Sequence, residues 1–316
     1  MSCAGANKIL LIYYTGTYNT RYITRLIEKK LTSAGYAVTS LEVTADLKPA
    51  DMSGYEFIGL GYPIYAFNSP LPFNRYLKKL RIPRGQKYFI YKNSGETFAL
   101  NNASSRIIKR RMKRGKAELC GEYHFVMPYN IHFAFDEAFV REILAYDEKL
   151  AEVLASDVKN GRKEIIGSNF IYNLASAIIS VQKLGGPVNS FFYRIDEQKC
   201  LRCNKCAEEC PENNISLRDG KIRFGHKCAM CMRCSFFCPA NAIKIGMLEG
   251  WKVNGGYDLE AAADRGAPEN PYITEASKGF YKCFIKTFRY IDKRYDELTA
   301  EKRRHVTESG NPTEPT

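Results

Sequence analysis

The chain has 316 residues, 45% of them hydrophobic, and carries a net charge of +13 at neutral pH. This length allows two domains, and the apolar content supports packed cores rather than a disordered chain. The longest weakly polar stretch, residues 169–181, is too short to cross a membrane, and the apolar run at residues 9–13 is too short for a signal peptide. We therefore expect a soluble, cytoplasmic protein.

Residues 1–160 alternate between strand-like and helix-like patterns. Apolar or alternating runs predict five strands, at residues 8–13, 36–43, 55–60, 87–91 and 122–127. Helical patterns lie between and after these strands, at residues 20–33, 70–80, 103–113 and 136–159. This order predicts an α/β domain with a doubly wound, five-stranded parallel sheet. Ligands of such sheets bind beyond the carboxyl ends of the strands, which marks the loops after residues 13, 61, 92 and 127.

The first of these loops, residues 15–20, is rich in hydroxyl groups and leads from a strand into a helix. Backbone N–H groups at a helix N-terminus attract a phosphate, so the phosphate of a flavin mononucleotide (FMN) is a candidate ligand. Neither a Walker lysine nor the G-x-G-x-x-G pattern is present, which disfavours a nucleoside triphosphate or a dinucleotide. Tyr18 stands where such loops often carry a second glycine, and an ordinary strand–helix turn remains the alternative.

A basic helix is predicted next, and residues 106–116 contain seven lysines and arginines. A solvated helix face is the favoured interpretation. A docking surface for an acidic protein partner comes second, and nucleic acid last, because no recognisable binding motif accompanies the charge.

A connector at residues 161–195 joins the sheet domain to the rest of the chain. Residues 171–184 predict one helix, which should stop at the Gly-Gly-Pro of residues 185–187. Its apolar positions indicate that the helix packs against a domain rather than forming a free linker.

Eight of the 11 cysteines fall within residues 200–238, in two C-x2-C-x2-C-x3-C-P motifs related by an offset of 28 residues. This repeat occupies a predicted small domain at residues 196–247. A tail at residues 248–316 follows, in which residues 275–304 are predicted to be helical with a core-facing apolar stripe.

The cysteine spacing is that of iron–sulfur proteins, in which a tight run of thiolates surrounds one cluster and the fourth cysteine binds the other cluster. Structural zinc sites usually pair C-x2-C units across a longer spacer, which fits these runs poorly. We therefore expect two [4Fe–4S] clusters. The first takes Cys200, Cys203, Cys206 and Cys238. The second takes Cys228, Cys231, Cys234 and Cys210.

The cysteine segment resembles the two-cluster bacterial ferredoxins at every motif position. Residues 15–20 resemble the flavodoxin phosphate loop, S/T-x-T-G-N-T, with matches at all positions but that of Tyr18. In flavodoxins two further loops cover the flavin ring. The resemblance thus implies a flavodoxin-like FMN domain at residues 1–160, with these cofactor-binding residues: Thr15, Gly16, Thr17, Tyr18, Asn19, Thr20, Pro63, Ile64, Tyr65, Ala66, Phe67, Asn93, Ser94, Gly95 and Glu96.

A flavodoxin-like domain followed by a two-cluster ferredoxin resembles the EFR-type ferredoxins, a fusion family found largely in anaerobes. The resemblance covers about residues 8–247 and implies electron transfer between FMN, two clusters and an external redox partner, in either direction. One alternative is an FMN-dependent reductase of a small acceptor, although no catalytic acid–base pair stands out. The other is a cluster-only ferredoxin whose flavin-free first domain serves for docking.

Overall fold

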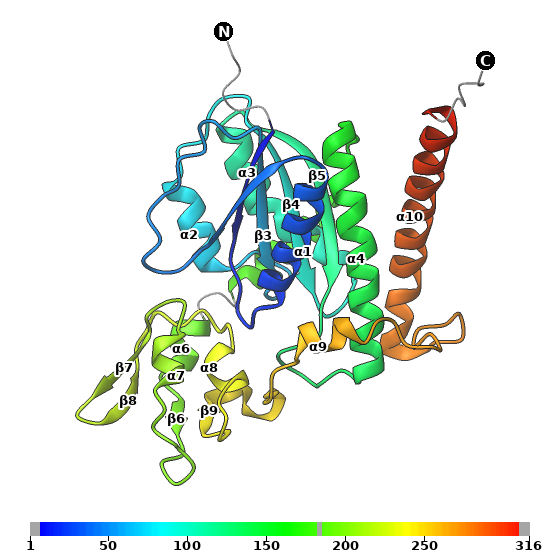
Figure 1. Ribbon diagram of the computed structural model, residues 1–316. Helices are drawn as coiled ribbons and strands as arrows, with labels where there is room; N and C mark the ends of the chain where they lie inside the picture. The colour runs from blue at the N-terminus through cyan, green and yellow to red at the C-terminus, as the bar shows by residue number, and fades with distance from the viewer. Residues whose placement is uncertain (1–6, 182–184, 310–316) are drawn as a thin grey trace, which may run out of the picture.

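The structure, a computed structural model, describes residues 7–181 and 185–309 (Figure 1). Its first half is a sheet with the strand order β2-β1-β3-β4-β5, in which neighbouring strands run parallel. The strands are β1 (Lys8–Tyr13), β2 (Ala37–Glu42), β3 (Phe57–Pro63), β4 (Lys87–Ser94) and β5 (Glu118–Val126). This is the doubly wound order of flavodoxin-like folds, so the predicted fold of this half is confirmed.

Helices cover both faces of the sheet. One face carries α1 (Asn19–Ser33) and α4 (Glu137–Asn160), and α10 (Lys282–Ser309) lies on the outer side of α4. The other face carries α2 (Leu71–Lys79), the 3-10 helix η1 (Ala99–Ser105) and α3 (Arg106–Arg114). Strand β1 is buried on both sides: Leu11 belongs to the first core and Leu10 to the second. A strand between two helical layers therefore needs an unbroken apolar run, as this sequence has.

The C-terminal helix α10 returns to the sheet domain and packs against α4. Phe284 and Phe288 are buried, and the ring of Tyr146 stacks on that of Phe288 with 4.0 Å between the centroids. Buried Arg294 pairs with Asp157 at 2.8 Å. The apolar stripe of the tail thus faces a core, as its helical spacing predicts.

The cysteine-rich unit is a small α+β structure with two antiparallel strand pairs, β6 with β9 and β7 with β8. Its elements are β6 (Tyr193–Ile195), α7 (Lys205–Glu208), β7 (Ile215–Arg218), β8 (Lys221–Phe224), α8 (Arg233–Phe236) and β9 (Ile243–Ile245). The β7–β8 turn has φ angles of 51° at Asp219 and 68° at Gly220, as a two-residue hairpin turn requires. The chain then runs through η3 (Gly246–Trp251), α9 (Leu259–Asp264) and η4 (Gly279–Tyr281) to α10.

The connector differs from its prediction in two ways. It forms two helices, α5 (Phe170–Ile179) and α6 (Gly185–Ser190), so the Gly-Gly-Pro stretch begins a helix instead of ending one. Residues 182–184 of the predicted helix lie outside the described residues. Helix α5 does pack against the sheet domain, as expected, but it does so through Ser176 and not through its most apolar side chains, which are exposed. Within the described ranges, no helix is long and apolar enough to cross a membrane.

Candidate redox site

The eight motif cysteines surround two small cavities in the cysteine-rich unit. The first cavity is lined by Cys200, Cys203, Cys206, Cys234 and Cys238. The second is lined by Cys210, Cys228, Cys231 and Cys234. We call Cys200, Cys203, Cys206 and Cys238 the outer cysteine set, and Cys210, Cys228, Cys231 and Cys234 the inner cysteine set. That each set binds one cluster, in the crossed grouping, stays a prediction.

The backbone around the two sets repeats with the 28-residue offset of the sequence. Left-handed φ angles occur in matched pairs: Arg202 with Met230 (54° and 52°), Asn204 with Met232 (58° and 63°), and Asn213 with Asn241 (49° and 48°). Backbone N–H groups also point at the sulfurs, since Asn214 donates to Cys210 Sγ and Ala242 to Cys238 Sγ, both at 3.3 Å. Hydrogen bonds to cluster sulfurs are one way in which proteins tune iron–sulfur centres.

The electrostatics of the cysteine sets favour binding of a positively charged group. Burial and neighbouring cysteines raise the pKa of Cys228 to about 12, and burial raises that of Cys206 to about 11. Several thiolates in a buried environment are stable only with a positive charge between them. Among the described residues, no three His, Cys, Asp or Glu side chains converge closely enough to bind a single metal ion. A four-iron cluster is larger than one ion, so cysteines standing around a cavity suit it.

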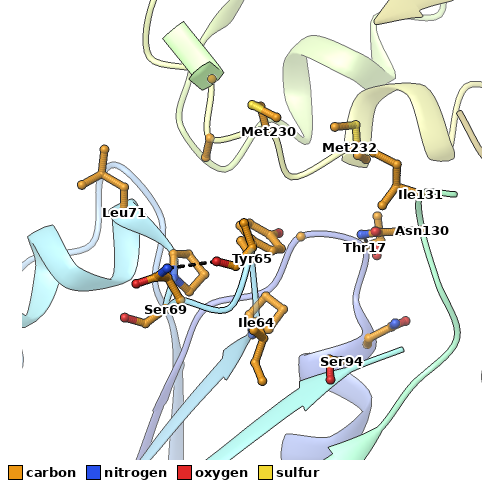
Figure 2. A pocket seen from close by; sticks show the side chains of 18 of the residues that line it. Thr17, Ile64, Tyr65, Ser69, Leu71, Ser94, Asn130, Ile131, Met230 and Met232 are labelled. Carbon is orange, nitrogen blue, oxygen red and sulfur yellow. Dashed lines mark hydrogen bonds between the residues drawn. The ribbon is translucent and has the colours of Figure 1, made fainter. Parts of the chain in front are cut away.

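A larger cavity, of about 630 Å³, lies between the carboxyl ends of the sheet strands and the cysteine-rich unit. We call it the interdomain cavity (Figure 2). All the residues expected to bind flavin line it except Tyr18: Thr15, Gly16, Thr17, Asn19, Thr20, Pro63, Ile64, Tyr65, Ala66, Phe67, Asn93, Ser94, Gly95 and Glu96. Its volume falls in the range of small-molecule and cofactor sites.

Tyr18 adopts the left-handed conformation that a glycine would take more easily, with φ at 68°, directly before α1. Its ring turns toward the cysteine-rich unit and packs on Phe237 with 5.0 Å between the centroids. Its hydroxyl donates to the Glu209 carboxylate at 2.9 Å, and the guanidinium of Arg233 lies 4.6 Å from the ring centre. Contacts from the second half of the chain thus stabilise a strained residue of the loop.

The loop has the chemistry to fit a phosphate. Thr15 Oγ1 and Tyr65 Oη are buried and have no hydrogen-bond partner in the described part of the chain. A buried hydroxyl without a hydrogen-bond acceptor is energetically unfavourable, and a phosphate would supply the acceptor. The negative charge of a phosphate would also interact with the unpaired N–H groups in the first turn of α1. Gly16 leaves no room for a side chain, because a Cβ there would lie 2.3 Å from Tyr65 Oη.

Side-chain hydrogen bonds join the loops around the cavity. Thr20 Oγ1 donates to Asn93 Oδ1 at 2.7 Å, and Asn130 Nδ2 donates to Thr17 Oγ1 at 2.9 Å. Asn130 belongs to the loop at residues 127–132, which also lines the cavity. The sequence marked this loop through the strand-end rule but named no residue in it, although an amide directly after the last strand was a usable signal.

His124 supports the loop at residues 93–96 through a hydrogen bond to Ser94. It is partly buried and shares a hydrogen bond of 2.7 Å between its Nε2 and Ser94 Oγ. Burial, with a smaller effect of nearby Lys92, lowers the pKa of His124 to about 3. The imidazole is therefore neutral at ordinary pH and holds Ser94 without adding charge to the cavity.

The cysteine-rich unit supplies the opposite wall of the interdomain cavity. Figure 2 shows Met230 and Met232 across from Tyr65 and Thr17. Cys228, of the inner set, also lines the cavity. Sequence reasoning missed this wall, because no local pattern states how two halves of a chain face each other.

Arg233 is the other functional residue that the sequence did not reveal. It stands between two inner-set cysteines in the chain, is buried, and reaches into the sheet domain. Its Nε donates to the Gly16 carbonyl at 2.6 Å, and its Nη2 to the Thr15 carbonyl at 2.8 Å and the Glu42 carboxylate at 3.2 Å. Burial lowers the pKa of Arg233, but the nearby Cys231, Tyr18 and Glu42 outweigh this and raise it overall, so the side chain stays charged.

Comparisons with known proteins cover parts of the chain. Residues 193–216 match the family described as 4Fe-4S binding domain. No curated protein sequence matches the chain. The chain therefore contains a 4Fe-4S binding region in its second half.

Among solved structures, the first half is similar to flavodoxins. A flavodoxin of Streptococcus pneumoniae TIGR4 is 16% identical, with 48% of this chain and 98% of that chain covered and a TM-score of 0.37. A short-chain flavodoxin associated with a bacterial microcompartment is 17% identical, with 49% and 98% covered and a TM-score of 0.37. A variant flavo di-iron protein of Thermotoga maritima is 14% identical, with 49% and 35% covered and a TM-score of 0.36.

Proposed function

We propose that this chain is an electron-transfer protein that binds FMN in the interdomain cavity and a [4Fe–4S] cluster at each cysteine set. Bound flavin accepts or gives one or two electrons and each cluster one, so together they link two-electron to one-electron chemistry. The residues present fit these groups: unpaired hydroxyls and a helix N-terminus for the phosphate, and four cysteines around each cluster cavity.

The observation that carries the proposal is the contact between Gly16 and Cys231. A Cβ built on Gly16 would lie 2.8 Å from the Cys231 carbonyl oxygen and 3.3 Å from its Cβ. The phosphate loop therefore touches a residue of the inner set. Electron exchange falls off steeply with separation, and Cys228 of the inner set lines the same cavity as the loops expected to cover the flavin ring. This arrangement favours direct exchange over two independent functions.

The outer set suits exchange with another protein. Cys203 is exposed. Arg202 beside it is also exposed, and nearby Lys199 and Lys205 pair with Asp196 and Glu209, each at 3.9 Å. The outer set therefore lies where a protein partner can approach it.

The alternative of a flavin-free docking domain depended mainly on Tyr18. Its ring packs on Phe237, outside the cavity lining, and its backbone takes the conformation of a glycine. This arrangement leaves the loop free for a phosphate and supports the FMN proposal.

Anaerobic purification followed by flavin, iron and sulfide analysis tests the proposal. We expect one FMN and about eight irons per chain, with flavin and cluster absorption bands in one spectrum. A chain that binds its iron but takes up no FMN on reconstitution would contradict the flavin half. A chain that retains about four irons would contradict the second cluster.

A further inference from the structure

Helix α5 exposes a wholly apolar side to the outside of the protein. Its exposed side chains follow helical spacing within an arc of about 100°. They are Phe170, Ile171, Leu174 and Ile178, with 79%, 70%, 50% and 65% of each side chain exposed, and Val181 just beyond the helix with 67%. We call this set the α5 apolar face. Exposed apolar patches of this kind mark interaction sites.

The opposite side of α5 is polar and attaches the helix to the sheet domain. Ser176 is fully buried, and its Oγ donates to the Phe67 carbonyl at 3.0 Å. Asn68 Nδ2 donates to the Ser176 carbonyl at 2.9 Å. The helix is thus oriented by hydrogen bonds with its apolar face outward, the reverse of the usual arrangement in a soluble domain.

The positive charge of the protein lies beside this helix. Residues 70–117 hold fourteen lysines and arginines against one acidic residue, Glu96. Three of the basic side chains pair with carboxylates outside the segment, Lys92 and Lys109 with buried Glu122, and Arg75 with Glu212. The segment includes α2, η1 and α3, which cover one face of the sheet. Helix α5 packs on η1, and Lys109 of α3 donates to the Ile166 carbonyl at 3.1 Å, just before α5.

Three kinds of surface could cover the α5 apolar face, and the charge pattern separates them. A second copy of the chain would bring two basic surfaces together, which is repulsive. A partner protein normally forms about one hydrogen bond per 100–200 Å² of interface, and the apolar face offers no side chain that can form one. Lipid hydrocarbon needs none, and anionic headgroups attract lysine and arginine beside it.

We propose that the α5 apolar face inserts into the surface of a membrane containing anionic lipids, with the basic side chains of α3 on the headgroups. Exposed Arg110, Lys113 and Arg114 are the candidates for the headgroup contacts. The protein would lie on the membrane without crossing it. This proposal does not depend on the cofactors.

Cosedimentation of the full chain with vesicles tests the proposal. We expect binding to phosphatidylcholine vesicles with about 30% phosphatidylglycerol, little binding to pure phosphatidylcholine, and weaker binding at high salt. Changing two exposed residues, Ile171→Asn with Ile178→Asn, should weaken binding at least about tenfold, because their buried apolar area is lost. Reversing charge with Arg110→Glu and Lys113→Glu should also weaken it.

A control variant distinguishes a loss of vesicle binding from a general loss of solubility or structure. Leu217→Asn removes an equally apolar side chain, 49% exposed, from the β7–β8 hairpin and should leave vesicle binding unchanged. A wild-type chain that stays in the supernatant with anionic vesicles would overturn the proposal. Unchanged vesicle binding by both the α5 variant and the charge variant would also overturn it. Light scattering that shows a dimer, made monomeric by the α5 variant, would assign the face to a second copy instead.

Discussion

Arg233 Nε and the Gly16 carbonyl oxygen lie 2.6 Å apart, so a side chain of the second cysteine motif contacts the loop at residues 15–20 of the sheet domain. The same guanidinium reaches the Glu42 carboxylate at 3.2 Å and the Glu209 carbonyl at 3.1 Å. One buried arginine therefore connects the loop, β2 and the cysteine-rich unit.

Replacing this arginine should separate the two halves. Arg233→Met removes every one of these donors and leaves the Gly16 and Thr15 carbonyls without them, while Glu42 keeps Arg21 as a partner at 2.7 Å. We therefore expect a loss of about 2–4 kcal/mol in the free energy of unfolding. Urea unfolding measures it. Lys205 occupies the matched position of the first motif, 28 residues earlier, but is exposed, so Lys205→Met is the control and should change stability by less than about 0.5 kcal/mol. Equal effects of the two changes would refute the role of Arg233.

Pairs of cysteine substitutions distinguish crossed from uncrossed clusters. Cys210→Ala with Cys228→Ala removes two inner-set ligands, so one cluster and about four irons should remain. Cys210→Ala with Cys200→Ala removes one ligand from each set and should damage both clusters. Iron and sulfide analysis of the anaerobically purified variants gives the answer. The opposite order of iron contents would show that each motif holds its own cluster.

Thr15 should contribute directly to FMN affinity. Its hydroxyl is buried and has no partner in the described structure, so Thr15→Val should weaken FMN binding about 5- to 100-fold with little loss of apoprotein stability. Fluorescence titration of the flavin-free chain with FMN measures the affinity. Thr39→Val, on the exposed edge strand β2, is the control. If Thr15→Val leaves the FMN affinity unchanged, the FMN phosphate does not bind at this loop.

His124 should make the protein less stable in acid. Its pKa is about 3 in the folded chain and about 6.5 when unfolded, so only the unfolded state takes the proton as the pH falls from 6.5. Its contribution to stability is present above pH 6.5 and should decrease by about 2 kcal/mol at pH 5.

Urea unfolding at pH 7.5 and pH 5 measures this pH dependence in the native chain and in two variants. His124→Gln should remove about 2 kcal/mol of the pH dependence. Ser94→Ala removes the partner hydroxyl but no titrating group, and should preserve that dependence while lowering stability at both values. A pH dependence that survives in His124→Gln would place its origin elsewhere.

Local patterns made much of this structure predictable. The apolar run at β1 identifies a strand buried on both faces, and the strand-end rule locates the cavity. The arrangement of the cysteines around two cavities follows from spacing, because a fixed offset of 28 residues repeats both the cysteines and the backbone turns around them.

The features that sequence reasoning missed are contacts between distant segments. Arg233 and Gly16 are 217 residues apart, and nothing near either residue signals the other. For Tyr18, the sequence showed the strained position but not Phe237, the residue that stabilises it. The rule that an apolar helix stripe faces a core failed for α5, because buried Ser176 and Asn68 set the orientation of that helix instead.

The rate of flavin reduction by a protein donor tests the central claim most directly. The interdomain cavity is far too small to admit a reduced ferredoxin, whereas dithionite is a small molecule. In a stopped-flow experiment, a reduced two-cluster ferredoxin should bleach the FMN of the native chain rapidly. The Cys210→Ala, Cys228→Ala chain, loaded with FMN, should bleach far more slowly with ferredoxin but as fast as the native chain with dithionite. Equal rates with ferredoxin would show that electrons reach the flavin without the inner cysteine set, and would contradict the account.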